Sequence, residues 1–141
     1  MNIDSIQNGI VIDHITAGQG MKLYELLHFD ELECSVAIIK NVSSKKMGKK
    51  DIIKVDADIP VNIDVIGYID PDATVNIIRD GVLAEKMNIQ MPSVLTNVIF
   101  CKNPRCITST EQELDHVFRL TDKENKVYRC VYCETKAERN L

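Results

Sequence analysis

The sequence lacks any long apolar run and any strong excess of one charge. No stretch approaches the roughly 18 consecutive apolar residues that predict a membrane span. The formal net charge is only -4 over 141 residues. Neither residues 1–90 nor residues 91–141 are clearly basic, as a nucleic-acid surface normally is. Composition therefore disfavours both a membrane protein and a nucleic-acid-binding protein.

Two further features are absent. The residues after Met1 contain no basic segment followed by an apolar one, which is the pattern of a secretory leader. We therefore expect a cytoplasmic, reducing location, in which cysteines stay as thiols or bind a metal. The sequence also has no internal repeat or low-complexity segment, and its length predicts one domain or two small ones.

The last third of the sequence contains four cysteines in two close pairs. Cys101 and Cys106 form a C-x4-C pair, and after a 23-residue interval Cys130 and Cys133 form a C-x2-C pair. Two such pairs on tight turns are typical of a tetrahedral zinc site. Four thiolates leave no position for a reactive water, so we expect one structural Zn2+ per chain. Two disulfides or four buried thiols are the alternatives, and disulfides would need an oxidising compartment.

A domain boundary is predicted near residues 90–93, because a strand pattern ends there and Pro92 interrupts strand pairing. This gives one domain over residues 1–91 and a second over residues 92–141. The second is too small to bury a stable core alone, so a metal would have to stabilise it.

The fifth cysteine, Cys34, lies in a strand-like run far from the others, and we expect it to be a small core residue.

The first domain alternates strand and helix patterns. Apolar, β-branched runs predict strands at residues 9–15, 33–42, 50–56, 73–78 and 82–86. Asp80-Gly81 predicts the turn of a hairpin. Helices are expected at residues 21–28 and 62–69, although β-branched residues are frequent in the second. This order predicts an α+β domain, with a mostly antiparallel sheet, helices on one face and the other face free.

The second domain contains strand patterns at residues 116–120 and 126–130, with a turn between them. Together with the cysteine spacing, they predict a small all-β domain similar to a zinc ribbon.

Polar side chains of the first domain could bind a ligand on the free face of the sheet. The candidates are Asp13, His14, Lys50, Lys54, Asn76 and Lys86. Ammonium groups suit phosphate, and an Asp with an Asn can bind ribose hydroxyls or the edge of a base. A nucleotide site is one interpretation, and a solvated face beside a strand end is the other. The loop at residues 43–50 does not have the spacing of a phosphate-binding P-loop.

Four segments, taken in order, resemble the regulatory chain of aspartate carbamoyltransferase. They are Val11-Ile-Asp-His-Ile15, residues 47–54, Ala73-Thr-Val-Asn76 and the cysteine spacing. The resemblance covers essentially the whole chain. It implies a non-catalytic subunit of the enzyme that commits carbamoyl phosphate and aspartate to pyrimidine synthesis. Residues 1–91 would be the nucleotide-binding allosteric domain, and residues 92–141 would be a zinc domain that docks on the catalytic chains.

The same resemblance implies the effectors CTP and ATP, with UTP as a further candidate. Asp13 and His14 would lie near the base, ribose and phosphate, Lys54 near the ribose and base, and Lys86 at the phosphates. The pocket would be completed by Asn76 and Ile78, with Val11 and Lys50 at its edge. The resemblance also implies a homodimer of regulatory chains, and an assembly of two catalytic trimers with three regulatory dimers.

Two geometric conflicts accompany this assignment. Strict alternation sends Asp13 and His14 to opposite faces of the sheet unless the strand twists or ends there. A two-residue turn at Asp80-Gly81 would set Asn76 opposite Glu85, and not opposite Lys86.

Two other functions compete with a regulatory subunit. A free zinc-ribbon module is the first, but the acidic balance speaks against a nucleic-acid partner. A small hydrolase using Asp13 and His14 is the second. No serine or cysteine nucleophile is identifiable beside a base, and a four-cysteine metal site would be closed to water.

Overall fold

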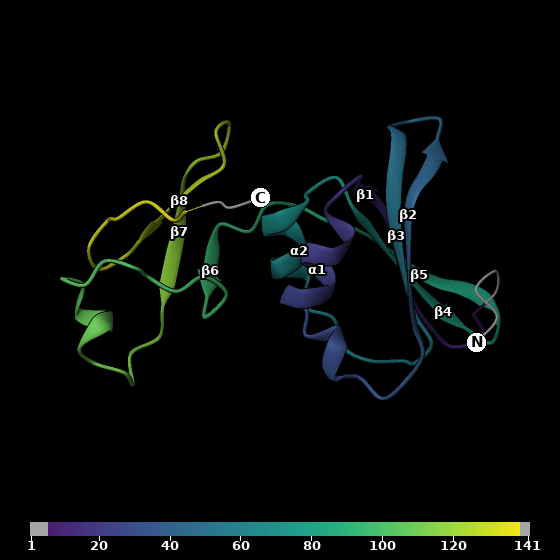
Figure 1. The fold of residues 1–141 in the computed structure, drawn as a ribbon, viewed down its shortest axis with the longest axis horizontal. Helices are drawn as coiled ribbons and strands as arrows, with labels where there is room; N and C mark the ends of the chain where they lie inside the picture. The colour runs from purple at the N-terminus through teal and green to yellow at the C-terminus, as the bar shows by residue number, and fades with distance from the viewer. Residues whose placement is uncertain (1–5, 139–141) are drawn as a thin grey trace. The chain divides into compact units, whose positions relative to one another are not determined.

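The computed structural model describes residues 6–138, which form two compact units that divide between Gln90 and Met91. The first unit is α+β and the second is all-β around the four cysteines (Figure 1). The predicted fold class is confirmed. No helix within the described residues is long and apolar enough to cross a membrane.

The first unit is built on a five-stranded antiparallel sheet with the order β2-β3-β1-β4-β5 (Figure 1). Its strands are β1 Gly9–Thr16, β2 Val36–Ser44, β3 Gly48–Val55, β4 Thr74–Arg79 and β5 Val82–Asn88. The predicted strands are thus present, although β2 begins later and β3 earlier than predicted. Cys34 lies before β2 and is half-buried, so its prediction as a core strand residue was wrong.

One face of this sheet forms the core of the unit. Its side chains are at most 1% exposed at Ile10, Ile12, Ile53, Val55 and Val75. Burial of each such side chain contributes about 1.5–3 kcal/mol. Because successive side chains of a strand point to opposite faces, the residues between these positions lie on the other face.

Two short helices lie on the core side of the sheet (Figure 1). Helix α1, Gly20–Leu26, contacts β2, β3 and α2, and it buries Leu23. Helix α2, Ile63–Ile69, begins after Asn62, whose side chain accepts hydrogen bonds from the backbone of Asp64 and Val65. Four apolar side chains of α2 are buried, so packing and the cap outweigh the weak helix preference of its β-branched residues.

β-Bulges interrupt the pairing on both sides of β3. Along β1, Ile12 pairs with Ile53 but Ile15 pairs with Asp51, so β1 contains one extra residue. His14, within this bulge, has a φ of 58°. The pairing of β2 with β3 shifts in the same way between Ile39 and Val42, where Asn41 also has a φ of 58°. The regular alternation assumed from sequence therefore fails at Asp13 and His14.

The β4–β5 hairpin has the two-residue turn that the sequence predicts. Asp80 and Gly81 have φ values of 54° and 78°, as the tightest hairpin turns require. The register then shifts between Ile77 and Ile78, which places an extra residue in β5. Asn76 consequently pairs with Lys86, and its predicted position opposite Glu85 was wrong.

The second unit is a three-stranded sheet with the order β6-β7-β8. Its strands are β6 Val94–Thr96, β7 Val117–Asp122 and β8 Val127–Cys130. Its apolar core is small, with Leu95, Phe118 and Tyr128 at 0% to 1% exposure. The hydroxyl of Tyr128 donates a hydrogen bond to the carbonyl of Pro92 at 2.6 Å, which fixes the start of this unit on its core.

Candidate functional sites

The four predicted metal ligands meet at one point of the second unit. Their Sγ atoms all lie within 4.8 Å of one another. The Sγ atoms of Cys101 and Cys133 are 3.6 Å apart, and those of Cys106 and Cys130 are 3.7 Å apart. Tetrahedral Zn–S bonds of ~2.3 Å would place the sulfurs about 3.8 Å apart. The residues present therefore fit a metal ion such as zinc.

Neighbouring polar groups orient these ligands. The Thr108 hydroxyl donates to Cys106 Sγ at 3.1 Å, and Thr135 Oγ1 lies 3.2 Å from Cys133 Sγ. His116 Nδ1 accepts a hydrogen bond from the backbone N–H of Cys101 at 3.1 Å. Such outer contacts hold metal ligands in place before the metal binds.

As free thiols, Cys101, Cys130 and Cys133 differ in pKa. Burial raises the pKa of Cys101 to about 12 and also raises the pKa of Cys130. Burial acts in the same direction on Cys133, but hydrogen bonds with Thr135 and Asn103 outweigh it and lower its pKa to about 6. Of these three, Cys133 is the most readily available as a thiolate. Metal binding must displace the protons of Cys101 and Cys130, so metal affinity should fall as the pH is lowered.

The predicted ligand-binding residues lie on the open face of the five-stranded sheet. Lys54 on β3 pairs with Val11 on β1, Val11 pairs with Asn76 on β4, and Asn76 pairs with Lys86 on β5. Directly paired residues point to the same face. These four residues thus form one row across four strands, which we call the open-face row. Ile78 lies on the same face of β4, two residues beyond Asn76.

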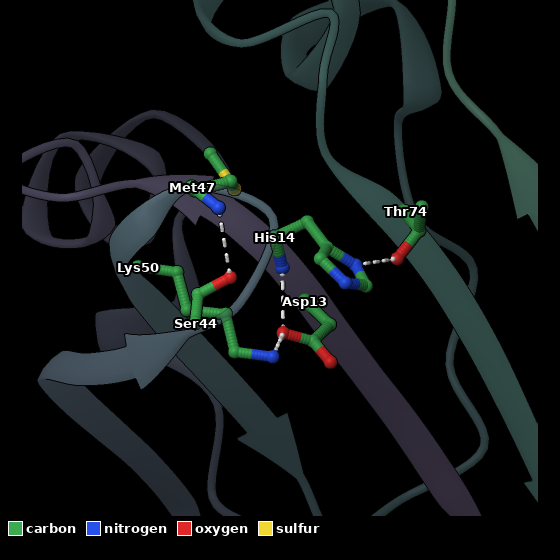
Figure 2. A network of polar contacts seen from close by, with 6 residues as sticks. All are labelled: Asp13, His14, Ser44, Met47, Lys50 and Thr74. Atoms are coloured by element: carbon green, nitrogen blue, oxygen red, sulfur yellow. Dashed lines mark hydrogen bonds and ion pairs between the residues drawn. The ribbon is translucent and has the colours of Figure 1, made fainter.

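A second group of polar residues lies on β1, β3 and β4, the strands that carry three of the four residues of the open-face row. Figure 2 shows this second group. Lys50 Nζ is 2.9 Å from Asp13 Oδ1, which also accepts a hydrogen bond from the His14 backbone N–H at 2.6 Å. The His14 ring points toward Thr74, with its Nδ1 atom 3.1 Å from Thr74 Oγ1. Thr74 pairs with Asp13, so the two share the open face. The β1 bulge therefore brings Asp13 and His14 to the same face.

The ionisation of Asp13 depends on this group. Partial burial acts to raise its pKa, but the bond from Lys50, the His14 N–H and nearby positive charge together hold the pKa below its ordinary value. Asp13 is consequently a carboxylate near neutral pH, and it can accept hydrogen bonds from hydroxyl groups of a ligand.

All eight predicted ligand-binding residues are thus on or beside one face of the sheet. Sequence reasoning missed Thr74, which contacts His14, and Asp51, which is fully buried beneath the site. Thr74 could have been predicted from the sequence, because it stands two residues before Asn76 and therefore lies on the same face of the strand. Nothing local in the sequence distinguishes Asp51 from an exposed aspartate.

A separate cavity of about 330 Å3 opens on the core side of the same sheet. Its walls include Ile10, Ile77 and Met87 from the strands and Ile59 from the segment before α2. At its margin, Arg79 Nε lies 3.8 Å from Asp58 Oδ2. None of the predicted ligand-binding residues lines this cavity.

Comparisons with known proteins match the two units separately. Residues 1–90 match the family model for the aspartate carbamoyltransferase regulatory chain, allosteric domain. Residues 93–141 match the model for the metal binding domain of the same chain.

Individual relatives match along nearly their whole length. The aspartate carbamoyltransferase regulatory chain of Clostridium tetani (strain Massachusetts / E88) is 50% identical over 135 residues, which are 95% of this chain and 94% of the relative. That of Clostridium botulinum (strain Hall) is 47% identical, covering 95% and 92%. That of Bifidobacterium longum (strain NCC 2705) is 41% identical, covering 98% and 99%.

The fold and the matches define a two-domain regulatory subunit. The chain belongs to the family of aspartate carbamoyltransferase regulatory chains. It is a non-catalytic subunit with an allosteric and a metal-binding domain, and a regulatory chain of this enzyme has catalytic chains as partners. Neither the hydrolase nor the free zinc-ribbon module describes it.

Loss of one metal ligand should unfold the second unit alone. Cys130→Ser removes a buried thiolate, so we expect the chain to lose about one equivalent of zinc. The small core of this unit is then insufficient, whereas the first unit has its own core and should stay folded. Elemental analysis and amide NMR spectra measure both effects.

Cys34→Ser is the matched control for this experiment. Cys34 lies outside the cluster, so this variant should keep its metal and both sets of amide signals. Full zinc content with a folded second unit in Cys130→Ser would contradict the four-ligand assignment.

Proposed function

We propose that this chain binds the effectors CTP and ATP, and UTP as a further candidate, on the open face of its allosteric domain. Nucleotide binding then regulates the catalytic chains and, through them, pyrimidine biosynthesis in the cytoplasm. The observation that supports the site most strongly is the open-face row beside the Asp13–Lys50 pair, on the side of the sheet away from α1 and α2.

The dimensions of the open-face row suit a nucleotide. Three strand spacings of ~4.8 Å separate its two ends, about 14 Å in all. Lys86, exposed on the edge strand β5, would bind the phosphates at one end. Lys54 would lie near the ribose and base at the other end, while Asn76 in the middle offers both a donor and an acceptor. Val11 and Ile78 supply apolar surface for the base.

The second polar group would bind the sugar and adjoining atoms. Asp13 is ionised, so it can accept hydrogen bonds from ribose hydroxyls. The His14 ring is oriented by Thr74 and would contact the base or phosphate. Lys50 is already paired with Asp13, which partly neutralises its charge. We therefore assign the principal phosphate contact to Lys86 and place Lys50 at the edge of the site.

In the second unit we propose one structural zinc ion, held by the four cysteines. Four thiolates leave the ion no open position, so it would stabilise the domain and not act on a substrate. Large apolar side chains are exposed near the cysteine turns at Phe100, Ile107, Val131 and Tyr132. Exposed apolar groups of this kind mark protein–protein surfaces, so we propose that this side of the domain docks on the catalytic chains.

We also propose that two regulatory chains form a dimer. In the first unit β5 is an edge strand, and Val82 and Leu83 on it are 64% and 56% exposed. An unpaired strand edge with apolar residues favours association with another chain. Three such dimers would combine with two catalytic trimers.

Removal of the proposed phosphate ligand should weaken nucleotide binding. Lys86→Ala deletes a charge-assisted contact, so we expect ATP and CTP to bind about 1.5–3 kcal/mol more weakly. Isothermal titration calorimetry on the full chain measures this difference. Lys123→Ala removes the same charge from an exposed position after β7 in the second unit, outside the proposed site, and should leave affinity unchanged. Equal affinities for the two variants would contradict the phosphate assignment.

Regulation should require both units. Reconstituted with catalytic trimers, the chain should make aspartate saturation depend on CTP or ATP, with a coupling free energy of about 1–3 kcal/mol. Removal of residues 91–141 should preserve nucleotide binding but eliminate this response, because the docking domain is lost. Assembly with the catalytic trimers and occupancy by the nucleotide must be confirmed in the same samples. If the saturation curves with and without effector are then identical, the chain has a structural role in the assembly and no regulatory one.

A further inference from the structure

A buried carboxylate lies directly behind the candidate nucleotide site. Asp51 on β3 follows Lys50 and is 0% exposed. Its Oδ2 atom accepts hydrogen bonds from the backbone N–H groups of Gly18 and Gly20, both at 3.0 Å. Its Oδ1 atom accepts one from the backbone N–H of Asn41 at 3.1 Å. Burial of a carboxylate is costly without such donors, so these three bonds fix its position.

The three donors come from segments on both sides of β3. Gly18 lies in the turn between β1 and α1, Gly20 is the first residue of α1, and Asn41 lies in the β2 bulge. A Cβ atom on Gly20 would lie 2.9 Å from Asp51 Oδ2, so the close approach requires glycine. Asp51 is therefore the point at which β1, β2 and the start of α1 are joined to β3.

The bulge in β1 and the bulge in β2 both lie next to residues that pair with Asp51 or Lys50 on β3. In β1 the extra residue lies just before Ile15, which pairs with Asp51 itself. In β2 it lies just before Val42, which pairs with Lys50. The β1 bulge contains Asp13 and His14. A one-residue slip of β3 would turn Lys50 away from the open face and separate it from Asp13.

We propose that Asp51 is a positioning residue for the nucleotide site. By binding the backbone of both neighbouring segments, it fixes the register in which Lys50 meets Asp13 and His14 turns toward Thr74. This inference rests on the proposed nucleotide-binding function. It assigns control of ligand affinity to a residue on the opposite, buried face of the sheet, which itself cannot touch the ligand.

The test is a double-mutant cycle on the full chain. Asp51→Asn keeps the shape of the side chain but replaces one accepting oxygen with an NH2 group, which must face an N–H donor. We expect ATP affinity to fall about tenfold. In a Lys50→Met background the same substitution should cost clearly less than tenfold, because the Asp13–Lys50 pair is already absent and only the His14–Thr74 contact is left to be disturbed. In a Lys86→Ala background Asp51→Asn should still weaken ATP binding about tenfold. Lys86 lies on β5, and two strands, β1 and β4, separate β5 from the strand that carries Asp51.

A second readout needs no nucleotide. Asp51→Asn should move the carboxyl pKa of Asp13 up toward its ordinary value, because Lys50 no longer lies beside it. Carbon-detected NMR titration measures this shift in the folded variant. If the wild-type chain bound no nucleotide, the proposed function would fail, and this titration would still decide the role of Asp51.

Gly20→Ala provides an independent perturbation if Asp51→Asn does not fold. The added methyl group displaces the carboxylate without removing its charge. It should weaken ATP binding in the wild-type and Lys86→Ala backgrounds and have a smaller effect with Lys50→Met. Unchanged ATP affinity, unchanged Asp13 titration, or the same fold-loss in all three backgrounds would overturn the proposal. An equal loss of ATP affinity in all three backgrounds would indicate that the substitution loosens the whole domain and does not act through Lys50.

Discussion

Burial of one face of the five-stranded sheet is the constraint on which the first unit depends. Ile10, Ile12 and Ile53 must point into the core, so Val11 and Lys54 must point outward. The same alternation continues into β4, and the register shift in β5 then brings Lys86 opposite Asn76 and completes the open-face row. The polar residues of the candidate site are therefore placed by the packing of the apolar residues between them.

The second unit obtains its stability differently. Its apolar core is small, and four cysteine thiolates converge where a larger domain would place more apolar side chains. A metal ion that closes this cluster couples its binding free energy to folding. The chain thus keeps its two tasks apart, with the candidate effector site on a sheet and the metal centre in a separate unit. This separation suits a non-catalytic subunit, because regulation needs two sites and no reactive group.

Local sequence patterns predicted the elements but not the irregularities between them. The β-branched runs, the Asp80-Gly81 turn and the cysteine spacing each depend on neighbouring residues, and the structure contains the elements they predict. The bulges do not depend on local pattern. The one at Asn41 is held by Asp51 from another strand, and the register shift in β5 follows a turn that was itself predicted. The pairing of Asn76 with Lys86 and the common face of Asp13 and His14 could therefore not be derived from alternation.

Nucleotide-induced changes in amide NMR shifts of the full chain test the location of the effector site most directly. The account predicts that ATP shifts the signals of the open-face row, at Val11, Lys54, Asn76 and Lys86, together with those of Asp13 and His14. Residues around the core-side cavity, such as Ile59 and Val61, should change little. Shifts confined to that cavity, with the open-face row unaffected, would contradict the account.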